Sequence, residues 1–310
     1  MNLALIISFL KGTIGAATPI LYAATGEIVS QRSGIMNLGL EGVMLMGAVS
    51  GYMVVLNTSN LALGIFTAAA VGLLIGLLFA FLTVTLQADQ VVSGLSITLF
   101  GTGLSGYIGK SASTSALDLH FPTLKIPLLS KIPVVGDVLF DQDLMVYVLY
   151  AVVIAACIFI YKTKWGMQLR TIGENPRAAD TLGINVYRTR YLYACVGSVL
   201  TALGGAYLTL CYTPLWFDGM TAGKGWIAVA LVIFSGWNPA IAALGAILFG
   251  GISVLSLRLQ LIDTSISSHF ISMLPYLCTV AVLLIFTNKR SRGRNPSPSS
   301  LGQPYDREGR

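Results

Sequence analysis

The sequence predicts an all-α, polytopic bundle of transmembrane helices. Of its 310 residues, 55% are hydrophobic and only 10% are charged, and the mean hydropathy is +0.77. Repeated apolar runs are long enough to cross, as helices, the roughly 30 Å hydrocarbon core of a bilayer. A water-soluble protein could not bury this much apolar surface in its interior. We therefore expect a membrane protein.

The cysteines, histidines and basic residues argue against several other classes of protein. All four cysteines lie inside apolar runs without a CxxC pair, and the chain has only two histidines, so neither a disulfide framework nor a zinc site is expected. The net charge of +6 does not indicate a nucleic-acid partner, because Lys and Arg flank the apolar runs. In that position they orient a chain in the membrane. We expect membrane lipid, and no nucleic acid, as a partner.

About nine apolar segments are expected to form membrane-crossing helices. The first of them lacks the cleavage pattern of a secretory signal, so we expect it to remain as a helix. The seventh has only 12 residues, which is too short to cross unaided, so we expect either a half-helix or one extended by the preceding loop. In chain order the segments are 3–24, 35–56, 61–86, 91–109, 144–161, 191–213, 225–236, 239–257 and 266–287.

The distribution of Lys and Arg predicts the orientation of this transmembrane domain, residues 1–287. The loop 162–190 and the tail 288–310 each carry six basic residues, and cytoplasmic segments retain such charges, so both should be cytoplasmic. Nine spans then place the N-terminus outside and the C-terminus inside. The segment 110–143 is the longest piece expected outside, either a docking surface or a loop folded over the span ends. The tail, rich in Ser, Pro, Gly and Arg, is expected to be disordered and to lie near anionic lipid.

The order of the segments also suggests an internal inverted repeat. Four predicted spans precede residue 110 and four follow residue 190. The single span 144–161 between them would invert one set relative to the other. Repeats of this kind are common in transporters and place a pathway at the interface of the two halves.

The polar loop 162–190 is expected to contain a compact helix that binds another protein. An Asn-Pro pair suits an N-cap followed by the first helical position, and one glycine before it and one after suit a break and a C-terminal cap. Two adjacent alanines leave room for a partner's groove. An ordinary solvated loop is the alternative. The candidate residues are Gly173, Asn175, Pro176, Ala178, Ala179 and Gly183.

A few polar residues inside the spans are candidates for lining a pathway. Glu41 lies about two turns into the second predicted span, with Asn37 one turn before it, and an ionisable group at that depth is unfavourable unless it faces a cavity or a partner. The alternative is that Glu41 binds exposed backbone or a Ser or Asn of a neighbouring helix. Asp89 and Gln90, just before the fourth span, either cap that helix or face the inner mouth of the route, and Ser93 is a further candidate for the pathway. No relay of carboxylates is visible.

Four stretches of the sequence resemble a known family. They are GEIVSQRSGIMNLGLEGVMLMGA (26–48), ADQVVSGLSITLFGTGL (88–104), ENPRAADTLGI (174–184) and GKGWIAVALVIFSGWNP (223–239). Together they resemble permease subunits of bacterial ABC importers for nucleosides and simple sugars, within the superfamily of branched-chain amino acid and ribose permeases. The shorter of the two nucleoside permease subunits is the most similar. Ala178, Ala179 and Gly183 match the family's coupling loop, whereas Arg177 stands where its pattern has Glu.

The resemblance implies a function and a set of partners. It implies a non-enzymatic, cofactor-free permease subunit that moves nucleosides across the cytoplasmic membrane by alternating access. The implied partners are a second, similar permease, a cytoplasmic ABC ATPase and an extracytoplasmic substrate-binding protein. The chain itself has no GxxxxGK[ST] phosphate-binding loop, because GMTAGKGW has the wrong spacing. Simple sugars such as ribose are the alternative substrates, and an ion-coupled transporter, with Glu41 as its ion-binding group, is the alternative mechanism.

Overall fold

The computed structural model is a helical bundle, and the prediction of an all-α, polytopic fold is confirmed. It describes residues 3–111, 116–117, 119, 121–127, 130, 132, 134–261, 268–290 and 297–307. Within these residues, seven helices are long and apolar enough to cross a membrane, and two shorter apolar helices accompany them, Lys224–Ser235 and Phe270–Ala281. The expected number of nine apolar segments is thus approximate, because two of them are short.

Most secondary-structure elements of the described residues are helices, and two short strands pair with each other. Two five-residue π-helical turns, η1 and η3, continue α3 and α9. In order the elements are α1 (Leu3–Arg32), α2 (Leu40–Thr58), α3 (Leu61–Ala80), η1 (Phe81–Thr85), α4 (Gln90–Gly109), β1 (Thr123–Lys125), α5 (Val135–Leu139), β2 (Asp141–Asp143), α6 (Leu144–Lys162), α7 (Lys164–Glu174), α8 (Pro176–Thr181), α9 (Val186–Tyr207), η3 (Leu208–Tyr212), α10 (Lys224–Ser235), α11 (Pro239–Leu261), α12 (Ser268–Ser272) and α13 (Leu274–Arg290).

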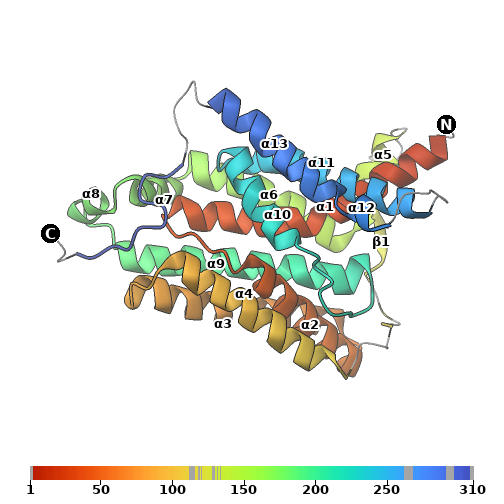
Figure 1. Ribbon diagram of the computed structural model, residues 1–310, viewed down its shortest axis with the longest axis horizontal. Helices are drawn as coiled ribbons and strands as arrows, with labels where there is room; N and C mark the ends of the chain where they lie inside the picture. The colour runs from red at the N-terminus through yellow and green to blue at the C-terminus, as the bar shows by residue number, and fades with distance from the viewer. Residues whose placement is uncertain are drawn as a thin grey trace.

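Helices α1 and α9 form the centre of the bundle and pack directly against each other (Figure 1). Gly26 of α1 faces Gly197 of α9 so closely that a Cβ on Gly26 would lie 2.5 Å from the Gly197 carbonyl oxygen. Small residues of this kind let helix backbones approach in a membrane, where packing replaces the hydrophobic effect as the main attraction between helices. The contact therefore fixes the central helix pair.

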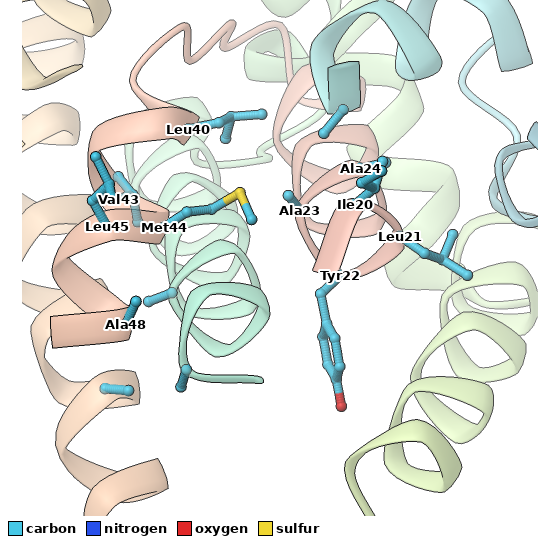
Figure 2. Close-up of a cluster of buried hydrophobic side chains, with 14 of the residues drawn as sticks. Ile20, Leu21, Tyr22, Ala23, Ala24, Leu40, Val43, Met44, Leu45 and Ala48 are labelled. Atoms are coloured by element: carbon cyan, nitrogen blue, oxygen red, sulfur yellow. The ribbon is translucent and has the colours of Figure 1, made fainter. Parts of the chain in front are cut away.

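Apolar side chains from α1 and α2 fill the space beside this pair (Figure 2). Ile20, Tyr22 and Ala23 of α1 and Val43 and Met44 of α2 are all completely buried. The Met44 side chain extends from α2 toward α1 (Figure 2). Both helices therefore contribute buried apolar side chains to the same central core.

The contacts of the central pair support the expected inverted repeat. Helix α9 packs against α1, α2 and α3, and helix α1 packs against α9, α10 and α11. Each central helix therefore packs against the second and third helices of the opposite half. In Figure 1, α2, α3 and α4 lie on one side of the central pair, α11 and α13 lie on the other, and α10 crosses in front of α1.

The chain between the first two helices differs from the prediction. Helix α1 continues to Arg32 instead of ending near residue 24, and α2 begins at Leu40 rather than at residue 35. Residues 33–39, here called the re-entrant segment, are not helical, and all but two of them are buried. The apolar character of 35–56 was interpreted as one continuous span because composition does not distinguish buried extended backbone from a buried helix.

The two ends of the bundle carry different connections. One end, the α8 end, holds α7, α8 and the C-terminus, and the other holds β1, α5 and the N-terminus (Figure 1). At that second end β1 pairs with β2, and Lys11 of α1 forms a 2.9 Å ion pair with Asp141. The described part of 110–143 is therefore folded against the helix ends.

The described part of the tail also differs from the prediction. Disorder was expected for 288–310, yet residues 288–290 belong to α13 and residues 297–307 pack against the α8 end. Ser300 is only 4% exposed and Tyr305 only 6%. Composition alone failed here because a few buried side chains and backbone hydrogen bonds hold the segment. Residues 291–296 and 308–310 lie outside the described residues.

Candidate functional site

The side chain of Glu41 joins two helices that begin inside the bundle. Glu41 lies in the first turn of α2, and its carboxylate accepts hydrogen bonds from the Gly223 N–H at 2.8 Å and the Gly225 N–H at 2.7 Å, at the start of α10. The Thr221 hydroxyl donates a third hydrogen bond. The first N–H groups of a helix have no partner within the helix and carry partial positive charge. The Glu41 carboxylate supplies acceptors for these N–H groups and places a negative charge beside their partial positive charge.

The junction of α2 and α10 lies at mid-height in the bundle. Gly42 packs against the backbone of Ile97 and Thr98, which are near the middle of the 20-residue helix α4. Helix α10 has only 12 residues, or about 18 Å at the usual rise, so it reaches only part of the way across a bilayer. The short seventh segment is therefore a half-helix that begins at this junction.

Glycines make the close approach at the junction possible. A Cβ on Gly225 would lie 2.5 Å from the backbone nitrogen of Glu41, and one on Gly42 would lie 2.5 Å from the Ile97 carbonyl oxygen. Gly223 has a φ of +74°, a backbone conformation that residues other than glycine adopt rarely. The two helix starts therefore meet backbone to backbone, and the Glu41 carboxylate lies between their polar ends.

Side chains satisfy the backbone of the re-entrant segment as it enters the bundle. The Glu27 carboxylate accepts the Asn37 N–H at 2.8 Å, and the side-chain oxygen Oε1 of Gln90 accepts the Met36 N–H at 2.7 Å. The Asn37 side chain in turn accepts the Gly39 N–H at 2.7 Å. Irregular backbone at membrane depth is stable only where protein groups satisfy it in this way. The segment is therefore an ordered, hydrogen-bonded part of the structure rather than a frayed helix end.

The four residues predicted for a pathway are thus brought together at one place. Asn37, Glu41 and Gln90 all bind backbone N–H groups, and Ser93 is buried on α4 directly before Gly94, which packs on the backbone of Leu38 and Gly39. For Glu41 this is the structural alternative left open by the sequence.

Several residues of this region were missed by sequence reasoning. Glu27 and Gln31 lie on one face of α1 and hydrogen-bond each other at 2.7 Å, and Gln31 also accepts the indole N–H of Trp237. Their spacing of four residues was a signal for a shared helix face. Thr221 and Gly223 carried no local signal, because they act only through contact with Glu41, about 180 residues away.

The second candidate site is helix α8, whose ends form as the sequence predicts. The Asn175 side chain accepts the Ala178 N–H at 3.0 Å as the N-cap, and Pro176 occupies the first turn. Gly183 has a φ of +81°, and the Ile184 N–H beyond it donates to the Ala179 carbonyl at 3.1 Å. Such a C-terminal arrangement is the usual role of a glycine after a helix.

The predicted surface of α8 has an outer and an inner part. Ala178 is exposed, Leu182 is 75% exposed, and a Cβ on Gly183 would meet no atom within 4 Å. Ala179, in contrast, is completely buried, and a Cβ on Gly173 would lie 2.3 Å from the Arg32 carbonyl oxygen. Only the outer part is therefore accessible to another protein, while Ala179 and Gly173 pack α8 and α7 onto the bundle.

Comparison with known proteins gives consistent results over most of the chain. Residues 9–283 match the family described as branched-chain amino acid transport system / permease component. The nucleoside ABC transporter permease protein NupC of Lactococcus lactis is 36% identical over 88% of this chain and 90% of its own length. The guanosine ABC transporter permease protein NupQ of Bacillus subtilis is 33% identical over 98% of both chains. A putative glucose ABC transporter permease, TsgC13 of Haloferax volcanii, is 36% identical over 96% of this chain and 97% of its own. No solved structure matches.

Proposed function

The chain belongs to the branched-chain amino acid transport system / permease component family, and from this premise we propose that it is the membrane-spanning subunit of an ABC importer for nucleosides. The observation that carries the substrate class is the similarity to nucleoside and guanosine permeases along nearly the whole chain. The membrane part follows from seven apolar helices within the described residues. The expected cellular location of the protein is a bacterial cytoplasmic membrane.

The energy source is proposed to be a separate ATPase subunit. The sequence contains no GxxxxGK[ST] loop to hold the phosphates of ATP. The outer part of α8, made of Ala178, Leu182 and Gly183, is a small-residue surface with an exposed leucine beside it. An amphipathic element of this kind fits a groove on a partner protein. In this proposal the ATPase closes on the outer part of α8, and α8 moves with it.

The orientation follows from this role. The α8 end faces the cytoplasm, and the N-terminus and the β1–β2 hairpin face the outside, as the distribution of Lys and Arg also predicts. An extracytoplasmic binding protein delivers substrate at the β1 end. A second, similar permease completes the translocation route, because the family resemblance is to one of two permease subunits.

Transport is proposed to occur by alternating access, with the α2–α10 junction as a fixed point. Transporters with inverted repeats place discontinuous helices near the middle of the membrane, and their halves rock around that level. Glu41 holds the starts of α2 and α10 together, so the two halves can rotate without separating there. Asn37, Gln90 and Ser93 hold the neighbouring backbone. In this proposal these residues act by positioning the helices that line the route.

A sugar importer is the second candidate. The observation in its favour is the 36% identity to a putative glucose permease over 96% of the chain. The two candidates share the fold, the ATPase and the mechanism, so they differ only in what is carried.

Transport by the complete system tests the proposal. The chain, its second permease and its ATPase are reconstituted in vesicles with the binding protein, and uptake of labelled guanosine and labelled glucose is measured with and without ATP. ATP-dependent guanosine uptake supports the main proposal. Glucose uptake alone supports the second candidate, and uptake that needs an ion gradient instead of ATP contradicts both.

A further inference from the structure

The C-terminal part of the chain lies where a link between α8 and the re-entrant segment would be expected. Residues 297–307, here called the C-terminal strap, follow α13 and lie beside α7 and α8 at the α8 end (Figure 1). They make hydrogen bonds to α7, to the re-entrant segment and to side chains of α9. Neither the family resemblance nor the similar proteins assign this segment a role.

The strap is attached to α7 through Ser300 and Ser299. The Ser300 N–H and hydroxyl both donate to the Gly173 carbonyl, at 2.9 and 2.7 Å. The Ser299 hydroxyl donates to Glu174 at 2.8 Å. Gly173 and Glu174 directly precede the N-cap of α8, so these bonds hold the base of that helix.

The strap is also attached to the re-entrant segment, with Arg190 between them. The Gly302 N–H donates to the Gly34 carbonyl at 3.2 Å. Arg190, only 1% exposed, donates from Nε to the Ser33 carbonyl at 3.2 Å and from Nη1 to the Gln303 carbonyl at 3.1 Å. One guanidinium on α9 therefore bridges the two segments.

Burial makes this bridge depend on the strap. A buried guanidinium is unfavourable unless its N–H groups have acceptors. The acceptors of Arg190 are the carbonyls of Ser33 and Gln303 and, more weakly, the Ser300 hydroxyl at 3.5 Å. Removing the strap would leave only Ser33 of these three. The positions of the strap and of the re-entrant segment are therefore energetically coupled.

The last part of the strap packs onto α8 itself. Tyr305 lies in an apolar cluster with Ile172, Ala179 and Val186, and Arg307 forms a 3.0 Å ion pair with Asp180 of α8. Burial, and then the nearby charge of Asp180, raise the pKa of the Tyr305 phenol, so the ring remains neutral in this cluster. Helix α8 is thus held at its base by Ser300 and on its inner face by Tyr305.

We propose that the C-terminal strap is a positioning element that transmits movement of α8 to the re-entrant segment and, through it, to the α2–α10 junction. The route runs from α8 through Ser300 and Arg190 to residues 33 and 34, and the same segment ends at Gly39, two residues before Glu41. This inference rests on the proposed function, because it requires that an ATPase moves α8. It adds a residue, Arg190, and a segment whose loss should uncouple ATP hydrolysis from transport.

The test compares coupling in reconstituted complexes of the full-length chain and three variants. Ser300→Ala removes the hydroxyl that binds Gly173 and Arg190 but keeps the backbone bonds. Gln303→Ala is the matched control, because only the main-chain carbonyl of Gln303 makes a described contact with Arg190. The third variant lacks residues 297–310. ATP hydrolysis, labelled nucleoside uptake and co-purification of the ATPase are measured for each.

The expected result separates the link from simple docking. Ser300→Ala should lower the number of nucleosides moved per ATP about fivefold, which corresponds to a loss of about 1 kcal/mol of net hydrogen bonding. Deletion of the strap should lower it further, while the ATPase remains bound in both and Gln303→Ala remains normal. Unchanged coupling in Ser300→Ala and in the deletion overturns the inference, as does loss of the ATPase from either variant. A full-length complex without ATP-driven uptake would instead contradict the proposed function.

Discussion

The carboxylate of Glu41 in α2 accepts the backbone N–H of Gly225 in α10 at 2.7 Å, so the first turns of these two helices share one carboxylate. The Gly223 N–H and the Thr221 hydroxyl bind the other oxygen of the same carboxylate. Glu41 is 9% exposed. Three hydrogen-bond donors therefore converge on one largely buried carboxylate, and this side chain connects the starts of α2 and α10 in the middle of the bundle.

The first prediction concerns the chemistry of this carboxylate. Glu41→Gln keeps one acceptor oxygen but replaces the other by an NH2 group, which donates and would face backbone donors, so the variant should assemble, melt at a lower temperature and transport more slowly. Glu41→Leu leaves three buried donors without an acceptor, at about 1–3 kcal/mol each, and should prevent folding. Size-exclusion yield, thermal melting and uptake measure these effects. Normal behaviour of both variants would reduce Glu41 to a tolerated polar residue.

The second prediction concerns backbone distance at the same junction. Gly225→Ala places a Cβ 2.5 Å from the Glu41 backbone nitrogen, which cannot move without displacing α2, so a loss of about 1–3 kcal/mol in the free energy of unfolding is expected. Gly103→Ala is the matched control, because a Cβ on Gly103 meets no atom within 4 Å and alanine favours the helix. Denaturation of the two variants in one detergent compares them. Equal stability would show that the helices are not in close contact.

Some of this arrangement could be predicted from the sequence, and the reason lies in the range of the interactions. Helix α8 was predicted correctly, since Asn175, Pro176 and Gly183 act within a few residues of their own positions. The role of Ala179 could not be predicted, because its buried face depends on Tyr305, more than 100 residues later.

The re-entrant segment shows the same limit. Its residues look like the start of an apolar span, and the side chains that satisfy its backbone, such as Glu27 and Gln90, come from two other helices. The polar stretch containing Glu27 therefore fell between the predicted spans 3–24 and 35–56, although it is the buried end of α1. Hydropathy reports how apolar a segment is and not which distant groups complete its hydrogen bonds.

The third prediction concerns orientation in the membrane. Leu182, 75% exposed beside α8, and Leu124, 44% exposed in β1, lie at opposite ends of the bundle. With each replaced in turn by cysteine, in a chain whose four native cysteines are changed to alanine, a membrane-impermeant thiol reagent should label intact cells at Leu124→Cys and only opened cells at Leu182→Cys. The reverse pattern would invert the proposed topology and place α8 out of reach of a cytoplasmic ATPase.

The last prediction uses two neighbouring alanines of α8 that differ in burial. Ala178 is exposed, so Ala178→Trp should leave the stability of the chain unchanged but block the surface proposed for the ATPase, abolishing its association and substrate uptake. Ala179 is completely buried against Ile172, Val186 and Tyr305, so Ala179→Trp overfills this cluster and should lower stability by about 1–3 kcal/mol or more. The same substitution at adjacent positions thus separates loss of binding from loss of folding. Pull-down of the ATPase, set against melting of each purified variant, distinguishes the two effects, and normal recovery of the ATPase with Ala178→Trp would mean that the outer part of α8 is only a solvated connector.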